Sequence, residues 1–231
     1  TGKKEGILFI DEINCVSETL APTMLQFLQN KTFGSHSVPE GWLIAAAGNP
    51  PEYNKSVREF DIVTLDRVRR MDIEADLEVW MEYAWKKEIH GSILAYLGMK
   101  KDHFYSVENT VDGKFFVTAR GWEDLSEILK AYEELGVEIT ENLVGEYLCR
   151  DEIARSFFAS YQLYRKYGED YGLERLLSGE MPEEEQQKKV KMAKDASFEE
   201  RFLVTGLLLD GLNGSFLTYE KMDGETGAVY Q

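Results

Sequence analysis

The chain has 231 residues, 43% hydrophobic and 12% aromatic, which is enough to bury a core as one large domain or two smaller ones. Its 26 Lys and Arg against 42 Asp and Glu give a net charge of −16, which argues against nucleic-acid binding because phosphate backbones are repelled. No apolar run approaches the roughly 18 residues of a membrane span, and no secretory signal precedes the first strand. The only two cysteines are far apart in the sequence, as in a reduced protein. We therefore expect a soluble cytoplasmic protein without a membrane partner.

The first third of the chain alternates between strand and helix patterns, typical of an α/β fold. Residues 7–10 are apolar throughout, as in a strand covered on both faces of a parallel sheet. Residues 42–47 predict a second buried strand, and 70–73 a third, weaker one. Between the first two strands, residues 19–31 predict a helix with Pro22 in its first turn and Gly34 closing it.

Helical patterns dominate after residue 76. A short helix is first expected from residue 57 or 59 to 67. Asp76 then predicts an N-cap, and alternating apolar residues around Asp112-Gly113 predict a hairpin. Thr118 should cap a helix that runs to Leu135. The remaining helices are expected at about 140–148, 150–178, 183–195 and 198–212, with loop or tail beyond.

Two acidic residues, Asp11 and Glu12, directly follow the first apolar run. They are expected at the carboxyl end of a parallel strand, where open α/β sheets bind their ligands. The first carboxylate can hold a magnesium ion through its waters, and the second can deprotonate an attacking water. Four apolar residues followed by Asp-Glu are typical of the Walker B motif of P-loop nucleotide hydrolases. The alternative is a strand that simply ends in two solvated acids.

Asn49 ends the second apolar run, which should lie beside the first. Its amide offers both a donor and an acceptor, so it can hold a water between Glu12 and a γ-phosphate. The alternative is an ordinary turn-forming residue in Gly48-Asn49-Pro50.

Two arginines follow at positions suited to phosphate. Arg67 stands at the expected end of a helix and before a strand, from where a guanidinium can project into a neighbouring subunit's nucleotide. A surface ion pair with Asp66 or Asp72 is the ordinary alternative. Arg120 lies in the first turn of the helix after the hairpin, where it either reaches phosphate from a lid or stays solvated.

Taken in order, these motifs resemble the Walker B, sensor 1, arginine finger and sensor 2 motifs of AAA+ ATPases. The resemblance is closest to the MoxR-type branch, in the stretches Asp11-Glu12-Ile13-Asn14, Asn49-Pro50 and Leu65-Asp66-Arg67-Val68. It covers about residues 5–135. Val68 stands where that branch usually has Phe, and the stretch TARGW around Arg120 departs from the usual sensor 2 pattern.

The resemblance implies an ATP-hydrolysing remodelling or chaperone-type subunit that uses ATP and Mg²⁺. In such a subunit Asp11 would position the metal and its nucleotide, Glu12 would act as general base, and Asn49 would order the water. Arg67 would act in trans on a neighbour's γ-phosphate, and Arg120 in cis from the lid. The resemblance also implies a homo-oligomeric ring, usually a hexamer, that works with a von Willebrand factor A-domain partner.

A phosphate-binding loop is missing from this pattern. No GxxxxGK followed by Ser or Thr occurs in the sequence, although a P-loop ATPase needs one to cradle phosphates. Thr1-Gly2-Lys3 resembles the end of such a loop, but three residues between Lys3 and the strand are too few for a parallel crossover. We therefore expect a fragment of an AAA+ core that is inactive by itself, with buried edges and an apolar face exposed. The alternatives are that a separate polypeptide supplies the missing segment or that the chain rearranges.

The predicted organisation has three parts. Residues 1–75 form a partial AAA+ α/β core, residues 76–150 a mostly helical lid with sensor 2, and residues 151–231 a helical extension and tail. The rival hypothesis is a non-hydrolysing scaffold or interaction module derived from an AAA+ domain. The missing phosphate loop favours the scaffold, while the joint presence of the Walker B, sensor 1 and finger residues argues against it.

Overall fold

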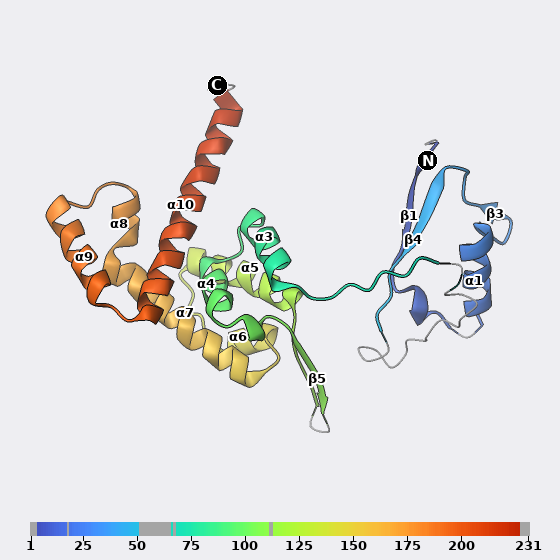
Figure 1. The fold of residues 1–231 in the computed structure, drawn as a ribbon, viewed down its shortest axis with the longest axis horizontal. Helices are drawn as coiled ribbons and strands as arrows, with labels where there is room; N and C mark the ends of the chain where they lie inside the picture. The colour runs from blue at the N-terminus through green and yellow to red at the C-terminus, as the bar shows by residue number, and fades with distance from the viewer. Residues whose placement is uncertain (1–3, 18, 51–65, 67, 111–112, 227–231) are drawn as a thin grey trace. The chain divides into compact units, whose positions relative to one another are not determined.

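The structure is a computed structural model, and it describes residues 4–17, 19–50, 66, 68–110 and 113–226. The protein is a mixed α/β structure, mostly helical, with two compact units, Thr1–Ile73 and Glu74–Gln231 (Figure 1). The predicted lid and extension, 76–150 and 151–231, therefore fall within one unit. Among the described helices, none combines the length and the apolar character that crossing a membrane requires.

The first unit is built on two parallel strands, β1 (Gly6–Ile10) and β4 (Trp42–Ala46). They pair in register from Gly6 opposite Trp42 to Ile10 opposite Ala46. The prediction that the two apolar runs lie side by side is therefore confirmed. Because the strands are parallel and in register, their carboxyl ends meet at one edge of the pair.

Helix α1 (Ala21–Asn30) connects these strands, together with the short antiparallel pair β2 (Thr32–Phe33) and β3 (His36–Ser37). Pro22 lies in the first turn of α1, as predicted. The C-cap of the helix is Lys31, in the left-handed conformation with φ 54°, and not Gly34, which lies in the β2–β3 turn. The Lys31 ammonium donates to the Trp42 carbonyl at 2.6 Å, which ties the end of α1 to β4.

The prediction that the first strand is covered on both faces is wrong for the described residues. Ile7 and Phe9 alternate outward along β1 and are 66% and 61% exposed. Leu43, which pairs with Ile7 across the sheet, is 61% exposed. Only Ile13 and Phe27 are buried apolar residues in the described part of this unit. The strand pair therefore presents an apolar face of the kind that helices cover in a complete parallel sheet.

The predicted third strand, at residues 70–73, does not form. Met71 and Ile73 are 82% and 89% exposed. The Arg70 guanidinium instead donates to the Asp72 carboxylate at 2.7 Å, within the segment itself. No described strand lies beside this segment to complete a hydrogen-bonded ladder, and a strand needs such a partner. The predicted helix ending at residue 67 lies outside the described residues, apart from Asp66.

The second unit begins with α3 (Leu77–Lys86) and α4 (Gly91–Met99). The Asp76 carboxylate accepts from the amides of Glu78 and Val79 at 2.8 and 3.1 Å, so the predicted N-cap is confirmed. Helix α4 is buried along its whole first two turns. It was not predicted, because an apolar run without helical periodicity gives no amphipathic signal.

A hairpin and three helices follow. Strands β5 (Ser106–Thr110) and β6 (Gly113–Val117) pair antiparallel, with the two-residue connection 111–112 outside the described residues. Gly113, expected in the turn, is the first residue of β6. Thr118 caps α5 (Ala119–Leu135) by accepting from the Gly121 amide at 3.2 Å, as predicted. The next helices are α6 (Glu141–Tyr147) and α7 (Asp151–Tyr171).

The chain ends in α8 (Leu173–Leu177), α9 (Glu183–Asp195) and α10 (Phe198–Thr226). A single helix over 150–178 was predicted, but Gly172 adopts φ 61° and separates α7 from α8. Helix α9 has the predicted bounds and no buried residue, as a solvated helix should. Helix α10 runs 14 residues past the predicted end at 212, and its last part extends beyond the other helices of the unit (Figure 1).

Aromatic side chains pack at the centre of the hydrophobic core of the second unit. Phe157 of α7 meets Tyr96 of α4 and Trp122 of α5 edge to face, with ring centroids 5.3 and 5.4 Å apart. The indole of Trp122 is fully buried and donates to the Phe104 carbonyl at 3.1 Å. The apolar residues of α3 and α5 that pack into this core are Leu77, Trp80, Met81, Ala84, Trp122, Leu125, Leu129 and Tyr132, whereas Leu135 is exposed.

Candidate functional site

The carboxyl ends of β1 and β4 bring three of the predicted site residues to one edge. Asp11 and Glu12 follow the last residue of β1, and Asn49 lies three residues after the last residue of β4. The ladder continues past the strands, because the Ala47 amide donates to the Ile10 carbonyl at 2.9 Å. All three polar side chains belong to exposed residues. The edge therefore presents two carboxylates and an amide to solvent.

Glu12 turns the chain sharply at this edge. Its backbone has φ 50° and ψ 38°, a left-handed conformation that is uncommon for a residue other than glycine. The Asp11 carboxylate accepts from the Glu12 amide at 2.9 Å, and the Glu12 carbonyl accepts from the Cys15 amide at 2.9 Å. These bonds form the turn that leads into the short 3-10 helix η1 (Ile13–Cys15). Strained conformations of this kind cluster at ligand sites, and they cost about 1–3 kcal/mol.

Asn14 joins the two strand ends. Its side-chain amide donates to the Asn49 main-chain carbonyl at 2.8 Å. The neighbouring Ile13 amide donates to the Ala47 carbonyl at 3.0 Å. Sequence reasoning gave Asn14 no role of its own. Asn14 is the fourth residue of the DEIN stretch, but only the fold shows that its side chain contacts the Asn49 carbonyl.

The two predicted arginines are not described relative to this edge. Arg67 lies outside the described residues. Arg120 is an exposed residue in the first turn of α5 and belongs to the second unit, so its position is described relative to α5 alone. Among the described residues, no group of three or more His, Cys, Asp and Glu side chains is arranged to hold a metal ion. A metal at Asp11 would therefore need ligands other than a protein cage.

A second polar cluster lies at the start of α4. Nδ1 of His90 lies 3.2 Å from the Ser92 amide nitrogen, which donates to it. Nε2 lies 3.0 Å from the Glu133 carboxylate, which also accepts from the Tyr161 hydroxyl at 2.7 Å. Burial alone would raise the pKa of Glu133, but the hydrogen bonds from His90 and Tyr161 outweigh it and hold this pKa below its ordinary value.

Ser92, His90 and Glu133 are residue types of a hydrolase triad, but they do not form a nucleophilic site. The Ser92 hydroxyl lies 2.7 Å from Nδ1 of His90, yet Ser92 is only 1% exposed. A substrate cannot reach it. The arrangement caps the first turn of α4 and links that turn to α5.

Asp210 of α10 completes this polar cluster. The Tyr164 hydroxyl donates to its carboxylate at 3.3 Å. Burial raises the pKa of Asp210 above its ordinary value, because the attraction of His90 and the hydrogen bond from Tyr164 do not offset the loss of solvent. The same carboxylate raises the pKa of Tyr164, which burial already raises. Glu133 and Asp210 thus lie near the same histidine with opposite pKa shifts.

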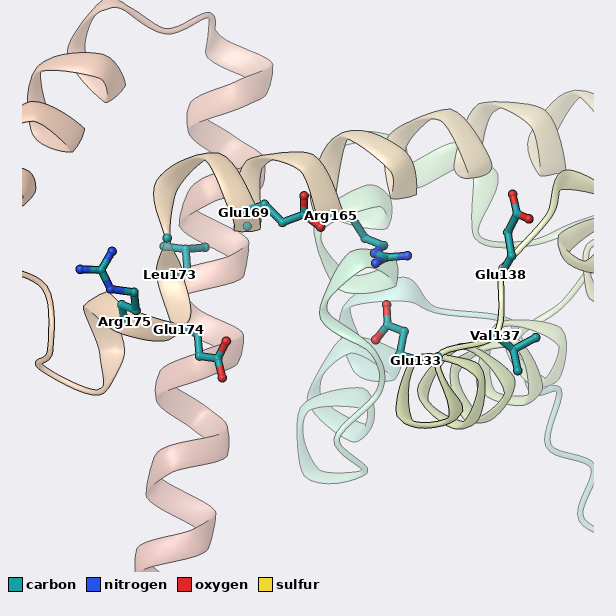
Figure 2. A pocket seen from close by; sticks show the side chains of 11 residues that line it. Glu133, Val137, Glu138, Arg165, Glu169, Leu173, Glu174 and Arg175 are labelled. Carbon is teal, nitrogen blue, oxygen red and sulfur yellow. The ribbon is translucent and has the colours of Figure 1, made fainter.

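A groove with a volume of about 890 Å³ lies between the end of α5, the second half of α7 and α8. Figure 2 shows Arg165 and Glu133 extending toward one another from α7 and α5. Arg175 at the far end is already paired with Glu185, through two bonds of 3.2 and 3.1 Å. The remaining charges are mostly acidic: Glu133, Glu138, Glu169 and Glu174. Among the described residues the groove holds no cluster of metal ligands, and Arg165 interacts with Glu133 and Tyr161.

Comparison with known proteins gives no assignment. No protein-family model matches the chain, no curated protein is similar to it, and no solved structure matches its fold.

Proposed function

We propose that the edge formed by β1 and β4 is the metal-binding and water-activating half of an ATP-hydrolysing site. The protein is then a remodelling or chaperone-type subunit of AAA+ type, closest to the MoxR-like branch. The in-register parallel pairing of β1 and β4 carries this proposal, because it supports the adjacency of Asp11, Glu12 and Asn49 at one strand edge. Ligand sites of open α/β sheets lie at this end of the strands.

The donor set at this edge fits magnesium with nucleotide better than magnesium alone. One oxygen of Asp11 is engaged by the Glu12 amide, and the residue is exposed. Mg²⁺ typically keeps several waters and is held by one or two carboxylates and substrate phosphates. Asp11 is the carboxylate that would hold it. When bound, the ion would neutralise charge on the phosphate oxygens.

The chain's own residues would then act on the water. The exposed Glu12 carboxylate accepts a proton from the attacking water as general base. The Asn49 amide orients that water by donating to it or accepting from it. Arg67 acts on the γ-phosphate of a neighbouring subunit, and Arg120 on that of its own subunit. Both arginine roles rest on the sequence pattern alone.

Phosphate binding must come from outside these 231 residues, since the sequence holds no Gly-rich loop followed by Lys. A complete site would therefore include a phosphate-binding loop in addition to this chain. The proposed assembly is a homo-oligomeric ring, a hexamer by resemblance, with a von Willebrand factor A-domain protein as the partner. Subunit neighbours are required because Arg67 acts in trans.

A scaffold without hydrolysis is the second candidate, and one observation favours it. Ile7, Phe9 and Leu43 form an exposed apolar face on the β1–β4 pair. Exposed apolar patches commonly mark protein–protein contacts. In this case the acidic residues of the edge would be ordinary solvated groups, and their replacement would not affect ATP.

The test is Glu12→Gln in a catalytically complete protein, meaning this chain together with the phosphate-binding loop. Glutamine keeps the size of the side chain but cannot accept the proton. Turnover should fall by about 10²–10⁴, while ATP binding and assembly remain. Turnover is measured as phosphate release and binding by calorimetry.

Glu40→Gln is the matched control. Glu40 is an exposed glutamate of the same unit, on the loop before β4 and not at its carboxyl end. It should leave turnover unchanged. If Glu12→Gln also leaves turnover within a few-fold of the parent protein, the hydrolase proposal fails and the scaffold is favoured.

A further inference from the structure

Asn14 connects the two halves of the proposed site through an unusually direct contact. Its Nδ2 donates to the carbonyl of Asn49 at 2.8 Å, although the two residues are 35 positions apart. The Ile13 amide makes the companion bond to the Ala47 carbonyl at 3.0 Å. Two hydrogen bonds therefore hold the turn after β1 against the segment after β4. We call this pair of bonds the Asn14 latch.

Gly48 makes the Asn14 latch sterically feasible. A Cβ atom at position 48 would lie 2.4 Å from Oδ1 of Asn14 and 2.8 Å from its Cγ. Both separations are too short for any side chain, so a larger residue at 48 would push the amide away. The Gly-Asn dipeptide after β4 thus has a specific role here: glycine leaves space for the amide, and the next carbonyl accepts from it.

Only an amide of this length suits position 14. The partner is a carbonyl oxygen, so the side chain must donate. Aspartate has the same shape but would set a carboxylate against that carbonyl. Oδ1 of Asn14 is buried and has no hydrogen-bond partner among the described atoms, so the side chain forms its one bond through Nδ2. Burying a polar atom in this way costs free energy, and the latch is the interaction that offsets it.

We infer that Asn14 is a positioning residue for the reaction, one that fixes Asn49 relative to Glu12. This inference rests on the proposed function. Glu12 occupies the left-handed position of the turn that Asn14 anchors, and Asn49 contributes the carbonyl that Asn14 binds. The direction of the general base and that of the water-ordering amide are therefore set by one contact. Asp11 is held by its own bond from the Glu12 amide, and the β1–β4 ladder by the strand pairing.

The expected kinetic signature is a change in kcat with little change in KM. A misplacement of about 1 Å in an active site can cost about 10²-fold in rate. In the catalytically complete protein, Asn14→Asp and Gly48→Ala should each lower kcat by about 10- to 100-fold. KM for ATP should stay within about twofold, because phosphate and metal binding do not use the latch. A rise in KM at unchanged kcat would contradict the positioning role.

A second measurement tests the latch in the 231-residue chain itself. Hydrogen exchange of the Ile13 amide reports the bond to Ala47. Asn14→Ala and Gly48→Ala should each speed this exchange by about tenfold or more, since both release the turn. In the double variant, exchange should be no faster than in Asn14→Ala alone, because the Cβ at 48 then no longer meets Oδ1 or Cγ. If the two changes speed the exchange of the Ile13 amide independently of one another, the proposed contact between Asn14 and position 48 is wrong.

The outcomes separate this inference from the proposed function. If Glu12→Gln abolishes turnover while Asn14→Asp leaves it unchanged, the positioning role alone is wrong. If Glu12→Gln leaves turnover intact, the proposed function is wrong and the positioning role with it. If both variants lose turnover and KM is unchanged, both hold.

Discussion

At the scale of single residues, Glu133 and Asp210 show how two carboxylates near one histidine acquire opposite properties. Glu133 accepts from His90 and Tyr161, and these bonds hold its pKa below the ordinary value despite burial. Asp210 has one long bond from Tyr164, and burial raises its pKa. The balance between burial and the nearby hydrogen bonds and charges decides the sign of each pKa shift. Stability should therefore respond oppositely to removing the two charges.

Glu133→Gln should lower the free energy of unfolding by about 1 kcal/mol at pH 7, a modest figure because the side chain is 34% exposed and screened. A carboxyl whose pKa is depressed by folding contributes stability above its unfolded pKa and loses it as the pH falls through the folded pKa. The difference from the parent should thus shrink below about pH 4. Urea unfolding at pH 7 and pH 3.5 measures it.

Asp210→Asn is the counterpart and should raise the free energy of unfolding by about 0.5–1 kcal/mol at pH 7. A carboxyl whose pKa is raised by folding is more easily protonated in the folded state. Its contribution to the free energy of unfolding is therefore present below the unfolded pKa and is lost as the pH rises through the folded pKa. Asparagine carries no charge, so it does not lose stability as the pH rises, and its side-chain oxygen can still accept from the Tyr164 hydroxyl. The gain should vanish at pH 3.5. Destabilisation at pH 7 would contradict the argument.

Residue-scale features were predictable where a local rule applies. Asp76 and Thr118 precede apolar-periodic segments and cap helices, as the sequence indicates. The acids after the first strand were found from their position alone. Asn14 and Gly48 were not found as a pair, because their contact joins residues that only the parallel register brings together.

At the scale of elements, α4 is the centre of the second unit and tolerates little change. Its first residue, Gly91, faces Tyr164 and Asp210: a Cβ there would lie 2.2 Å from the Tyr164 hydroxyl and 2.5 Å from the Asp210 carboxyl carbon. Residues 91–97 are all buried. The glycine is therefore a packing requirement between α4, α7 and α10.

Gly91→Ala should lower the free energy of unfolding by about 1–3 kcal/mol through overpacking. Gly145→Ala is the matched control, because Gly145 lies within α6 and nothing lies within 4 Å of an added Cβ. There alanine should stabilise by about 0.5–1 kcal/mol through helix propensity. Thermal unfolding of both variants measures the contrast. A neutral Gly91→Ala would show that α4, α7 and α10 pack less closely than described.

Element prediction succeeded for amphipathic segments and failed elsewhere. Helix α5 was found because its apolar positions recur at helical spacing, and α9 because its acids precede its bases, as in a solvated helix with internal ion pairs. The strand at 70–73 was wrong because its pairing partner is not available among described strands. The end of α10 was placed too early because glycine and polar content were taken to indicate loop, whereas the helix continues to Thr226.

At the scale of the whole molecule, the two units differ in how well they cover their apolar residues. The second unit buries a continuous aromatic and aliphatic core. In the first unit the described residues bury little, and Ile7, Phe9 and Leu43 remain exposed. The sequence predicted such an apolar face from the missing phosphate-loop segment. The face agrees with a site completed by polypeptide outside these residues, and equally with a scaffold surface.

Arg67 separates these two possibilities by its effect on turnover. As a finger in trans it would contribute about 10³–10⁵ to the rate, whereas a surface ion pair contributes about 0–1 kcal/mol to stability and nothing to turnover. In a complete ring, Arg67→Ala should therefore abolish ATP hydrolysis while ATP binding persists. Arg69→Ala and Arg70→Ala are the controls, because both residues are close enough in sequence to substitute. Unchanged turnover in all three variants would contradict the hypothesis that an arginine of this segment acts as a finger in trans.

The claim that the ends of β1 and β4 form one hydrolytic site is tested most directly by a double-mutant cycle on turnover. Glu12→Gln and Asn49→Ala are made singly and together in the catalytically complete protein, and kcat is measured at saturating ATP. If both residues act on one water, each change should lower kcat strongly and the double variant should be little slower than the slower single variant. Effects that multiply, or an Asn49→Ala variant with the parent's kcat, would contradict a shared site at this edge.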